Sequence, residues 1–70
     1  MDLIGFDGSE KVVVEVRSVT GPNDPIDAVG DAKRRQVISL SRKLGASRVD
    51  FLGIGFSDTH VDFHWIPGSL

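Results

Sequence analysis

Residues 1–17, MDLIGFDGSEKVVVEVR, decide the fold that we expect for this chain, because they place two β-rich runs on either side of a turn signal. The runs cover residues 2–6 and 10–17, and Asp7-Gly8 follows the first of them. An Asp-Gly pair between apolar runs is a strong short-range signal for a β-hairpin. The sequence therefore predicts an antiparallel hairpin at its start.

This hairpin carries two carboxylates and a guanidinium within its most apolar stretch: Asp2, Glu15 and Arg17. Side chains alternate between the two faces of a strand, so a hairpin loop with an even number of residues would place all three groups on one face. A four-residue loop would pair Asp2 with Glu15, and a two-residue loop would move the register by two without changing the face. An odd loop would separate them. Residues directly opposite have Cβ atoms about 5 Å apart, where two carboxylates repel unless a cation lies near them.

Two interpretations of these charges remain open from the residues alone. Asp2 and Glu15 suit Mg²⁺ or Mn²⁺, which favour oxygen ligands and can assist in-line attack on a phosphate. In that case Arg17 would stabilise developing negative charge. Alternatively, Asp2 lies at a frayed terminus, and Glu15 and Arg17 form an ordinary surface pair that contributes little to stability.

The rest of the chain alternates turn, helix and strand signals. Residues 18–30 are rich in turn formers, with Asp24 a candidate cap for a short turn. Residues 31–44 have helical apolar spacing, and Gly45 is placed to end the helix. Residues 48–56 are apolar on both faces, which is typical of an interior strand, and residues 60–66 alternate. We expect an α/β fold of order ββαββ, with a mixed sheet and a right-handed crossover through the helix.

Composition limits the classes of protein and site. The 70 residues form one small domain, and the lack of cysteine excludes disulfides and thiolate metal sites. No apolar run approaches the length of a membrane span, and no signal peptide is evident, so we expect a cytoplasmic protein with no membrane partner.

Charge is unevenly distributed although its net value is only −2. Residues 1–30 hold six acidic and two basic residues, whereas residues 31–50 hold six basic and two acidic ones. Lys33, Arg34 and Arg35 begin the predicted helix and are candidates for contact with DNA phosphates. The alternative is an ordinary solvated helix face.

The last strand presents a second group of possible ligands, His60, Asp62 and His64, on one face. The two histidines would lie about 13 Å apart in an extended strand and could not bind one ion without a bulge. We therefore expect a hydrated strand face rather than a zinc site. Trp65 has the character of a core or interface anchor.

Several segments together resemble one family: DLIGFDG, VVVEVR, PIDAVGDAKRRQV, RVDFLGIG and the terminal HWIPGSL. In this order they look like the YraN-like family of predicted endonucleases, which is similar to Holliday-junction resolvases and belongs to the restriction-endonuclease-like superfamily. The resemblance covers nearly the whole chain. It implies a restriction-endonuclease-like core and a metal-dependent nuclease.

The resemblance also implies roles for residues. The first acid falls on Asp2 and the Glu-x-Lys element on Glu15-Val16-Arg17, so Asp2 and Glu15 would hold Mg²⁺ and, with Arg17, form the catalytic group. The basic helix start falls on Lys33, Arg34, Arg35 and Gln36, and the acid of the third strand falls on Asp50.

Two departures from the family pattern affect what is expected. Arg17 stands where the family has Lys, and Arg cannot act as a general base because it does not lose its proton. The chain also begins at Met1-Asp2, so residues 1–70 would form a single nuclease-like domain without the usual N-terminal helix and strand. The uncovered sheet would favour a homo-oligomer or a chain that supplies the missing elements.

These observations lead to two functional hypotheses. The first is metal-dependent hydrolysis or binding of DNA, including branched DNA, by an endonuclease whose site is incomplete. The alternative is a catalytically inactive nuclease-like domain that acts in protein interaction or self-assembly.

Overall fold

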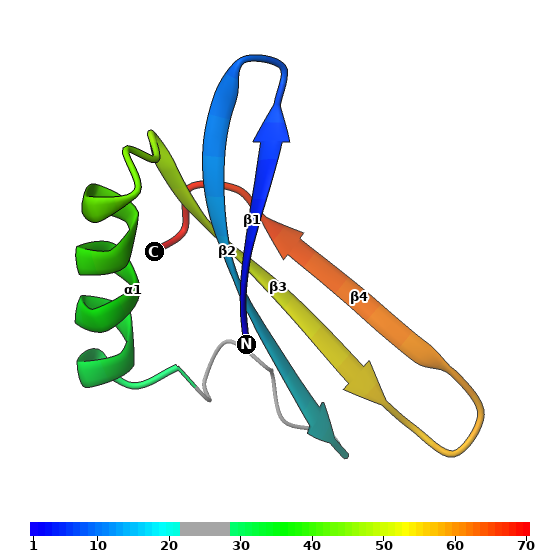
Figure 1. Cartoon of the computed structure of the whole chain (residues 1–70). Coiled ribbons are helices and arrows are strands. Elements are labelled where there is room, and N and C mark those ends of the chain that lie inside the picture. The colour runs from blue at the N-terminus through cyan, green and yellow to red at the C-terminus, as the bar shows by residue number, and fades with distance from the viewer. Residues whose placement is uncertain (22–28) are drawn as a thin grey trace.

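The computed structural model describes residues 1–21 and 29–70 of the chain. Four strands and one helix follow one another as β1 (Asp2–Asp7), β2 (Glu10–Thr20), α1 (Asp31–Lys43), β3 (Arg48–Phe56) and β4 (Val61–Ile66) (Figure 1). This is the ββαββ order that the sequence predicts. The suggested cap at Asp24 lies outside the described residues.

The four strands form one mixed sheet in the order β1-β2-β3-β4. β1 pairs with β2 and β4 pairs with β3 in antiparallel fashion, whereas β2 and β3 are parallel. The parallel pair is joined through α1, as the helical segment between the two runs predicts, and β3 is the interior strand that its apolar sequence indicates. The protein is therefore a small α/β structure with a mixed four-stranded sheet and one helix.

The hairpin has the even loop on which the alignment of the charged residues depends. β1 ends at Asp7 and β2 begins at Glu10, so Gly8 and Ser9 form the turn. Gly8 has φ +61°, a left-handed conformation that glycine adopts without steric cost. The register places Asp2 directly opposite Glu15.

β2 is longer than its sequence indicates. Residues 18–20 carry turn-forming character in the sequence but continue the strand, because they pair in parallel with residues 54–56 of β3. Pairing with a neighbouring strand outweighs local turn preference here, which is common because strand formation depends strongly on context.

α1 begins after Gly30, carries Asp31 in its first turn and ends at Leu44, where Gly45 has φ +69°. The predicted apolar stripe is only partly buried. Val37 is fully buried against Val13 and Val49, whereas Leu44 is half-buried at the margin of this core. The core is small because α1 packs mainly on β2 and β3.

The sheet therefore has two unlike faces. We call the side that carries Val13, Glu15 and Val49 the helix face, because α1 covers it. The opposite side, which carries Leu3, Val14, Val16, Leu52, Ile54, Phe63 and Trp65, is the open face. No described helix or strand covers the open face, and the molecule is only 15 Å thick along its shortest axis.

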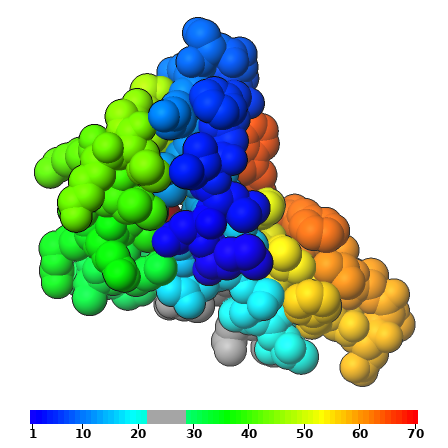
Figure 2. Space-filling view, viewed as in Figure 1, coloured from blue at the N-terminus to red at the C-terminus, as the bar shows by residue number. Residues whose placement is uncertain are grey.

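The space-filling view shows how little of the sheet is covered. β4 and the turn that precedes it project away from the body that α1 covers (Figure 2). Every residue of β4 is exposed. Within residues 1–21 and 29–70, no helix is long and apolar enough to cross a membrane.

Candidate functional site

The candidate site lies on the helix face, where the start of β1 meets β2 under the first turns of α1. The ladder extends beyond Asp2, since the Val16 amide donates to the Met1 carbonyl at 2.7 Å. This pairing fixes the chain terminus and holds Asp2 opposite Glu15. The structure therefore does not support a frayed position for Asp2.

Glu15 is the buried member of the pair. Its side chain is 0% exposed although its neighbours in the site reach solvent. The Arg17 Nε lies 2.8 Å from Glu15 Oε1, and the amino group of Met1 lies 3.9 Å from the same oxygen. Despite these contacts, neither carboxylate oxygen has a hydrogen bond of good geometry among the residues that the structure describes.

Lys33 completes the group from α1. Its Nζ lies 3.5 Å from Asp2 Oδ2 and 3.8 Å from Glu15 Oε2, so one ammonium lies within 4 Å of both carboxylates. Lys33 is 26% exposed, which leaves the site open to solvent on this side.

The position of Lys33 revises the predicted basic patch. The sequence groups Lys33 with Arg34 and Arg35 as one phosphate-binding cluster. In the structure Lys33 turns toward the carboxylates, whereas Arg34 and Arg35 are exposed on other sides of the helix. Consecutive helical residues point in directions about 100° apart, so three neighbours cannot share one surface.

The two carboxyl groups have unlike proton affinities. Burial, followed by the neighbouring Asp2 carboxylate, raises the pKa of Glu15. The pKa of Asp2 is lowered, chiefly by the side chain of Glu15 directly opposite, with Lys33 and the chain terminus adding to the effect. As pH falls, Glu15 therefore takes up a proton before Asp2.

The residues of the site fit a hard divalent cation that takes only one or two of its ligands from the protein. Mg²⁺ is commonly held by one or two carboxylates, with water and substrate phosphate as its remaining ligands. Asp2 and Glu15 supply two carboxylates. The buried oxygens of Glu15 accept no hydrogen bond of good geometry, and a bound cation would supply the interaction that they lack. No cluster of three or more His, Cys, Asp or Glu side chains suited to a metal occurs in the described part of the chain. The pair alone could not form a closed protein cage.

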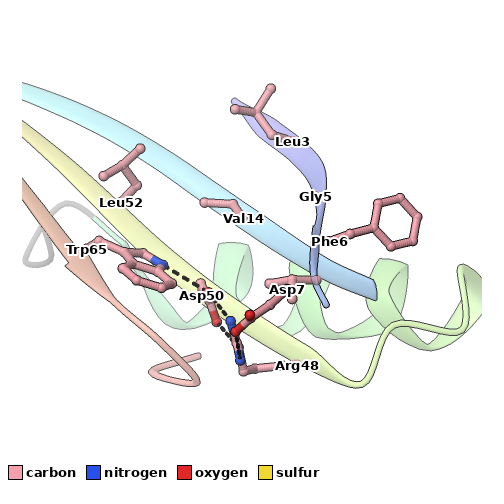
Figure 3. Close-up of a pocket in the computed structure, with 10 residues that line it drawn as sticks. Leu3, Gly5, Phe6, Asp7, Val14, Arg48, Asp50, Leu52 and Trp65 are labelled. Carbon is pink, nitrogen blue, oxygen red and sulfur yellow. Dashed lines mark hydrogen bonds and ion pairs between the residues drawn. The ribbon is translucent and has the colours of Figure 1, made fainter. Parts of the chain in front are cut away.

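Asp50 does not belong to this site. The resemblance aligned it with a family acid, but the register places Phe51 beside Glu15, so Asp50 points to the open face. Its carboxylate is 1% exposed and fully satisfied. It accepts hydrogen bonds from Arg48 Nε at 2.8 Å, Trp65 Nε1 at 2.9 Å and the Gly68 amide at 2.8 Å (Figure 3).

This arrangement gives Asp50 a structural role. Its pKa is lowered despite burial, because Arg48, Gly68 and Trp65 all donate to the ionised form. Arg48 also contacts Asp7 and Glu10 at the end of the hairpin. One guanidinium thus joins β1, β2 and β3, and the carboxylate anchors β4 and the C-terminal residues.

The remaining candidates are exposed, but β4 begins at Val61, so His60 lies in the turn before the strand, whereas Asp62 and His64 are strand residues. His60 Nε2 lies 3.7 Å from Asp62 Oδ2, and both side chains are more than half exposed. His64 lies opposite Gly53, farther along β4. Trp65 is 57% exposed and only its indole nitrogen is held, so the alternative of a core residue is wrong.

Comparisons with known proteins identify no relative. No family model, no curated protein and no solved structure matches the chain. The site must therefore be interpreted from its own geometry. The feature that sequence reasoning missed is the contact of Lys33 with the carboxylates, and the only signal for it is that α1 follows β2 and returns over the same face of the sheet.

Proposed function

We propose that this chain binds DNA and hydrolyses its phosphodiester bonds with the help of Mg²⁺ or Mn²⁺. The observation that carries the proposal is the pairing of Asp2 with a fully buried Glu15, beneath a lysine that is within 4 Å of both. A buried carboxylate without hydrogen bonds is unfavourable for stability alone, and such groups are common at functional sites. The proposal agrees with the activity that the YraN-like resemblance implies.

Asp2 and Glu15 would hold the cation. When bound, a divalent cation polarises phosphate and increases the acidity of water. The carboxylates must be ionised for this, so binding displaces the proton that Glu15 retains because of burial. Metal affinity should therefore increase as pH rises.

Lys33 supplies chemistry that Arg17 cannot. A lysine ammonium can transfer a proton, whereas a guanidinium remains charged throughout. Arg17 lies against Glu15 and is suited to orienting that carboxylate and to neutralising charge on a phosphate. Lys33 lies on the solvent side of both carboxylates, where an attacking water would approach. We assign the water-orienting role to Lys33.

The decisive experiment is a Mn²⁺ titration of ¹⁵N-labelled protein, followed by amide line broadening. We expect broadening centred on Asp2, Glu15 and Lys33 in the wild-type chain, and its loss in Glu15→Gln. Asp58→Asn is the matched control, because it removes one carboxylate from the turn between β3 and β4 and should keep the broadening. Cleavage of linear and branched DNA in Mg²⁺ is then measured for the same three proteins and for Lys33→Ala.

The outcomes separate the hypotheses. Localised broadening with cleavage that Lys33→Ala lowers by at least about tenfold supports the proposal, since general acid–base groups contribute about 10²–10⁴-fold. Localised broadening without cleavage would leave a metal-binding domain that is not a nuclease. No localised broadening would contradict the proposal and favour the alternative of an inactive domain that acts through protein contacts.

A further inference from the structure

The open face is the largest feature that the proposed function does not use. Its apolar side chains come from all four strands and remain accessible: Phe63 is 67% exposed, Trp65 57% and Leu3 48%. In Figure 3, Leu3, Val14 and Leu52 project from the side of the sheet opposite α1, and Leu52 lies near the Trp65 ring. Continuous apolar surface of this kind marks an interaction site on a soluble protein.

The charges on this face are confined to one end and already paired. Arg48 contacts Asp50, Asp7 and Glu10, and Asp50 is satisfied by its four donor groups. Beyond that end, the described part of the open face carries no charged side chain. The described part of the open face therefore offers no unpaired cation that could bind a nucleic acid or an acidic peptide. The surface that best complements the open face is another uncharged apolar face.

The size of the face matches a stable protein interface. The molecule extends 39 × 28 Å in its two longer directions, and all four strands contribute side chains to the open face. A standard interface buries about 800 Å² on each partner, which this area can supply. In addition, only six hydrophobic residues are buried among residues 1–21 and 29–70, so a second layer on the sheet would supply apolar burial that the monomer lacks.

The shape of the open face is also suited to a contact between two copies related by a twofold axis. A hollow of about 360 Å³ lies beside Leu3, Val14, Leu52 and Trp65, and it also borders the paired charges of Asp7, Arg48 and Asp50. Phe63 stands exposed on the same face, two residues before Trp65 on β4 and outside the lining of the hollow. An apolar cavity of about 150 Å³ already accommodates a benzene ring, so the hollow can receive a phenylalanine. A twofold axis pairs each such ring with the hollow of the other copy, because an isologous contact uses the same patch twice.

We infer that a second copy of this chain covers the open face, giving a twofold dimer whose sheets pack face to face. Two packed sheets lie about 10 Å apart, with the side chains of both inner faces interdigitated. α1 of each protomer then lies on the outside of the dimer. The Asp2–Glu15 pair remains accessible on both outer faces, so dimer formation and metal binding are independent.

The test is sedimentation velocity of the full chain from micromolar to millimolar concentration, compared with three variants that each carry one substitution to aspartate. We expect a monomer–dimer equilibrium in the wild type. Leu3→Asp and Phe63→Asp should each weaken the dimer by at least about tenfold, or about 1.4 kcal/mol, since a buried charge disrupts the apolar anchors on which an interface depends. Ile4→Asp is the matched control: Ile4 is the neighbouring residue, 54% exposed, but lies on the helix face and should leave the dimer unchanged.

A second readout does not depend on whether the variants fold. Trp65 is the only tryptophan of the chain and lies on the inferred interface, so acrylamide quenching of wild-type fluorescence should fall as concentration rises. A wild-type monomer at all concentrations would overturn the inference and assign the face to a different partner. A dimer disrupted by Ile4→Asp but not by Leu3→Asp or Phe63→Asp would overturn it as well, as would quenching that is independent of concentration.

Discussion

At Glu15 the strand alternation that buries Val13 also buries a carboxylate. Val13 and Glu15 are two residues apart on β2, so both lie on the face that α1 covers. For Val13 this position is favourable. For Glu15 it removes water from an ionisable group and leaves Arg17, Lys33 and the chain terminus as its nearest cations. A single periodic pattern therefore produces both the core and the candidate site.

The pKa of Glu15 leads to a prediction about stability. Because its pKa is raised in the folded state, the native protein holds this proton more tightly than the unfolded chain. The resulting stabilisation is complete at low pH and is lost as pH rises through the folded-state pKa of Glu15. The contribution of Asp2 to stability depends on pH in the opposite direction. Because its pKa is lowered in the folded state, this stabilisation is lost as pH falls through the folded-state pKa of Asp2.

Glu15→Gln should therefore become increasingly stable relative to the wild type as pH rises through the folded-state pKa of Glu15. Glutamine keeps the shape of the protonated acid and can still donate to Asp2. Urea unfolding followed by Trp65 fluorescence measures the difference at each pH and at one protein concentration. Asp58→Asn, an exposed position in the turn between β3 and β4, is the control. Parallel pH profiles for Glu15→Gln and the wild type would contradict the assignment of the buried proton.

At the scale of the element, α1 divides its basic residues between two tasks. Lys33 faces the sheet and contacts the carboxylates, whereas Arg34 and Arg35 face solvent. The other end of the helix carries Arg42 and Lys43, also exposed. Arg34 and Arg35 follow Lys33 directly, whereas Arg42 and Lys43 lie at the far end of the helix. We therefore expect the N-terminal end of α1 to contact DNA.

The double variant Arg34→Ala/Arg35→Ala should bind DNA more weakly without loss of metal binding. Each phosphate contact contributes about 0.9 to the slope of log affinity against log salt, so the slope should decrease by about 2. Fluorescence anisotropy with a labelled DNA duplex at several salt concentrations measures this change. Arg42→Ala/Lys43→Ala removes the same charge from the opposite end of α1. An equal loss for both double variants would show that net charge, not position, determines binding.

At the scale of the whole molecule, one helix is too little to cover a four-stranded sheet. α1 packs on β2 and β3, so β1 and β4 retain exposed apolar residues and the open face has no covering element among the described residues. The buried core is small even for 70 residues, and domains of this size often depend on association for stability. Folding and dimer formation should therefore be coupled.

This coupling makes the melting temperature depend on concentration. A partner present at a hundred times its dissociation constant adds about 2.7 kcal/mol, and 1 kcal/mol corresponds to about 4–8 °C in a domain of this size. We expect the melting temperature to rise by at least about 4 °C over a hundredfold increase in concentration. Circular dichroism at several concentrations measures it, with Phe63→Asp as the variant that should show no rise. A melting temperature independent of concentration in the wild type would indicate a monomer.

Much of the architecture was determined by the sequence alone. The turn signal at Asp7-Gly8, the helical spacing of residues 31–44 and the two-sided apolar run at 48–56 predict the hairpin, the crossover helix and the interior strand, because each depends on local conformation and on the period of burial. The pairing of Asp2 with Glu15 also follows from the sequence once the loop is even, since alternation along a strand has a fixed period of two.

Only the tertiary structure decided which groups meet across elements. It brought Lys33 from α1 to within 4 Å of the carboxylates, and it placed Asp50 on the opposite face through the parallel register of β2 and β3. That register is set by how the crossover packs, and nothing in the local sequence of either strand specifies it. The exposure of the open face is likewise a property of the assembled layers, because a strand pattern indicates which residues seek burial but not whether any element is available to bury them.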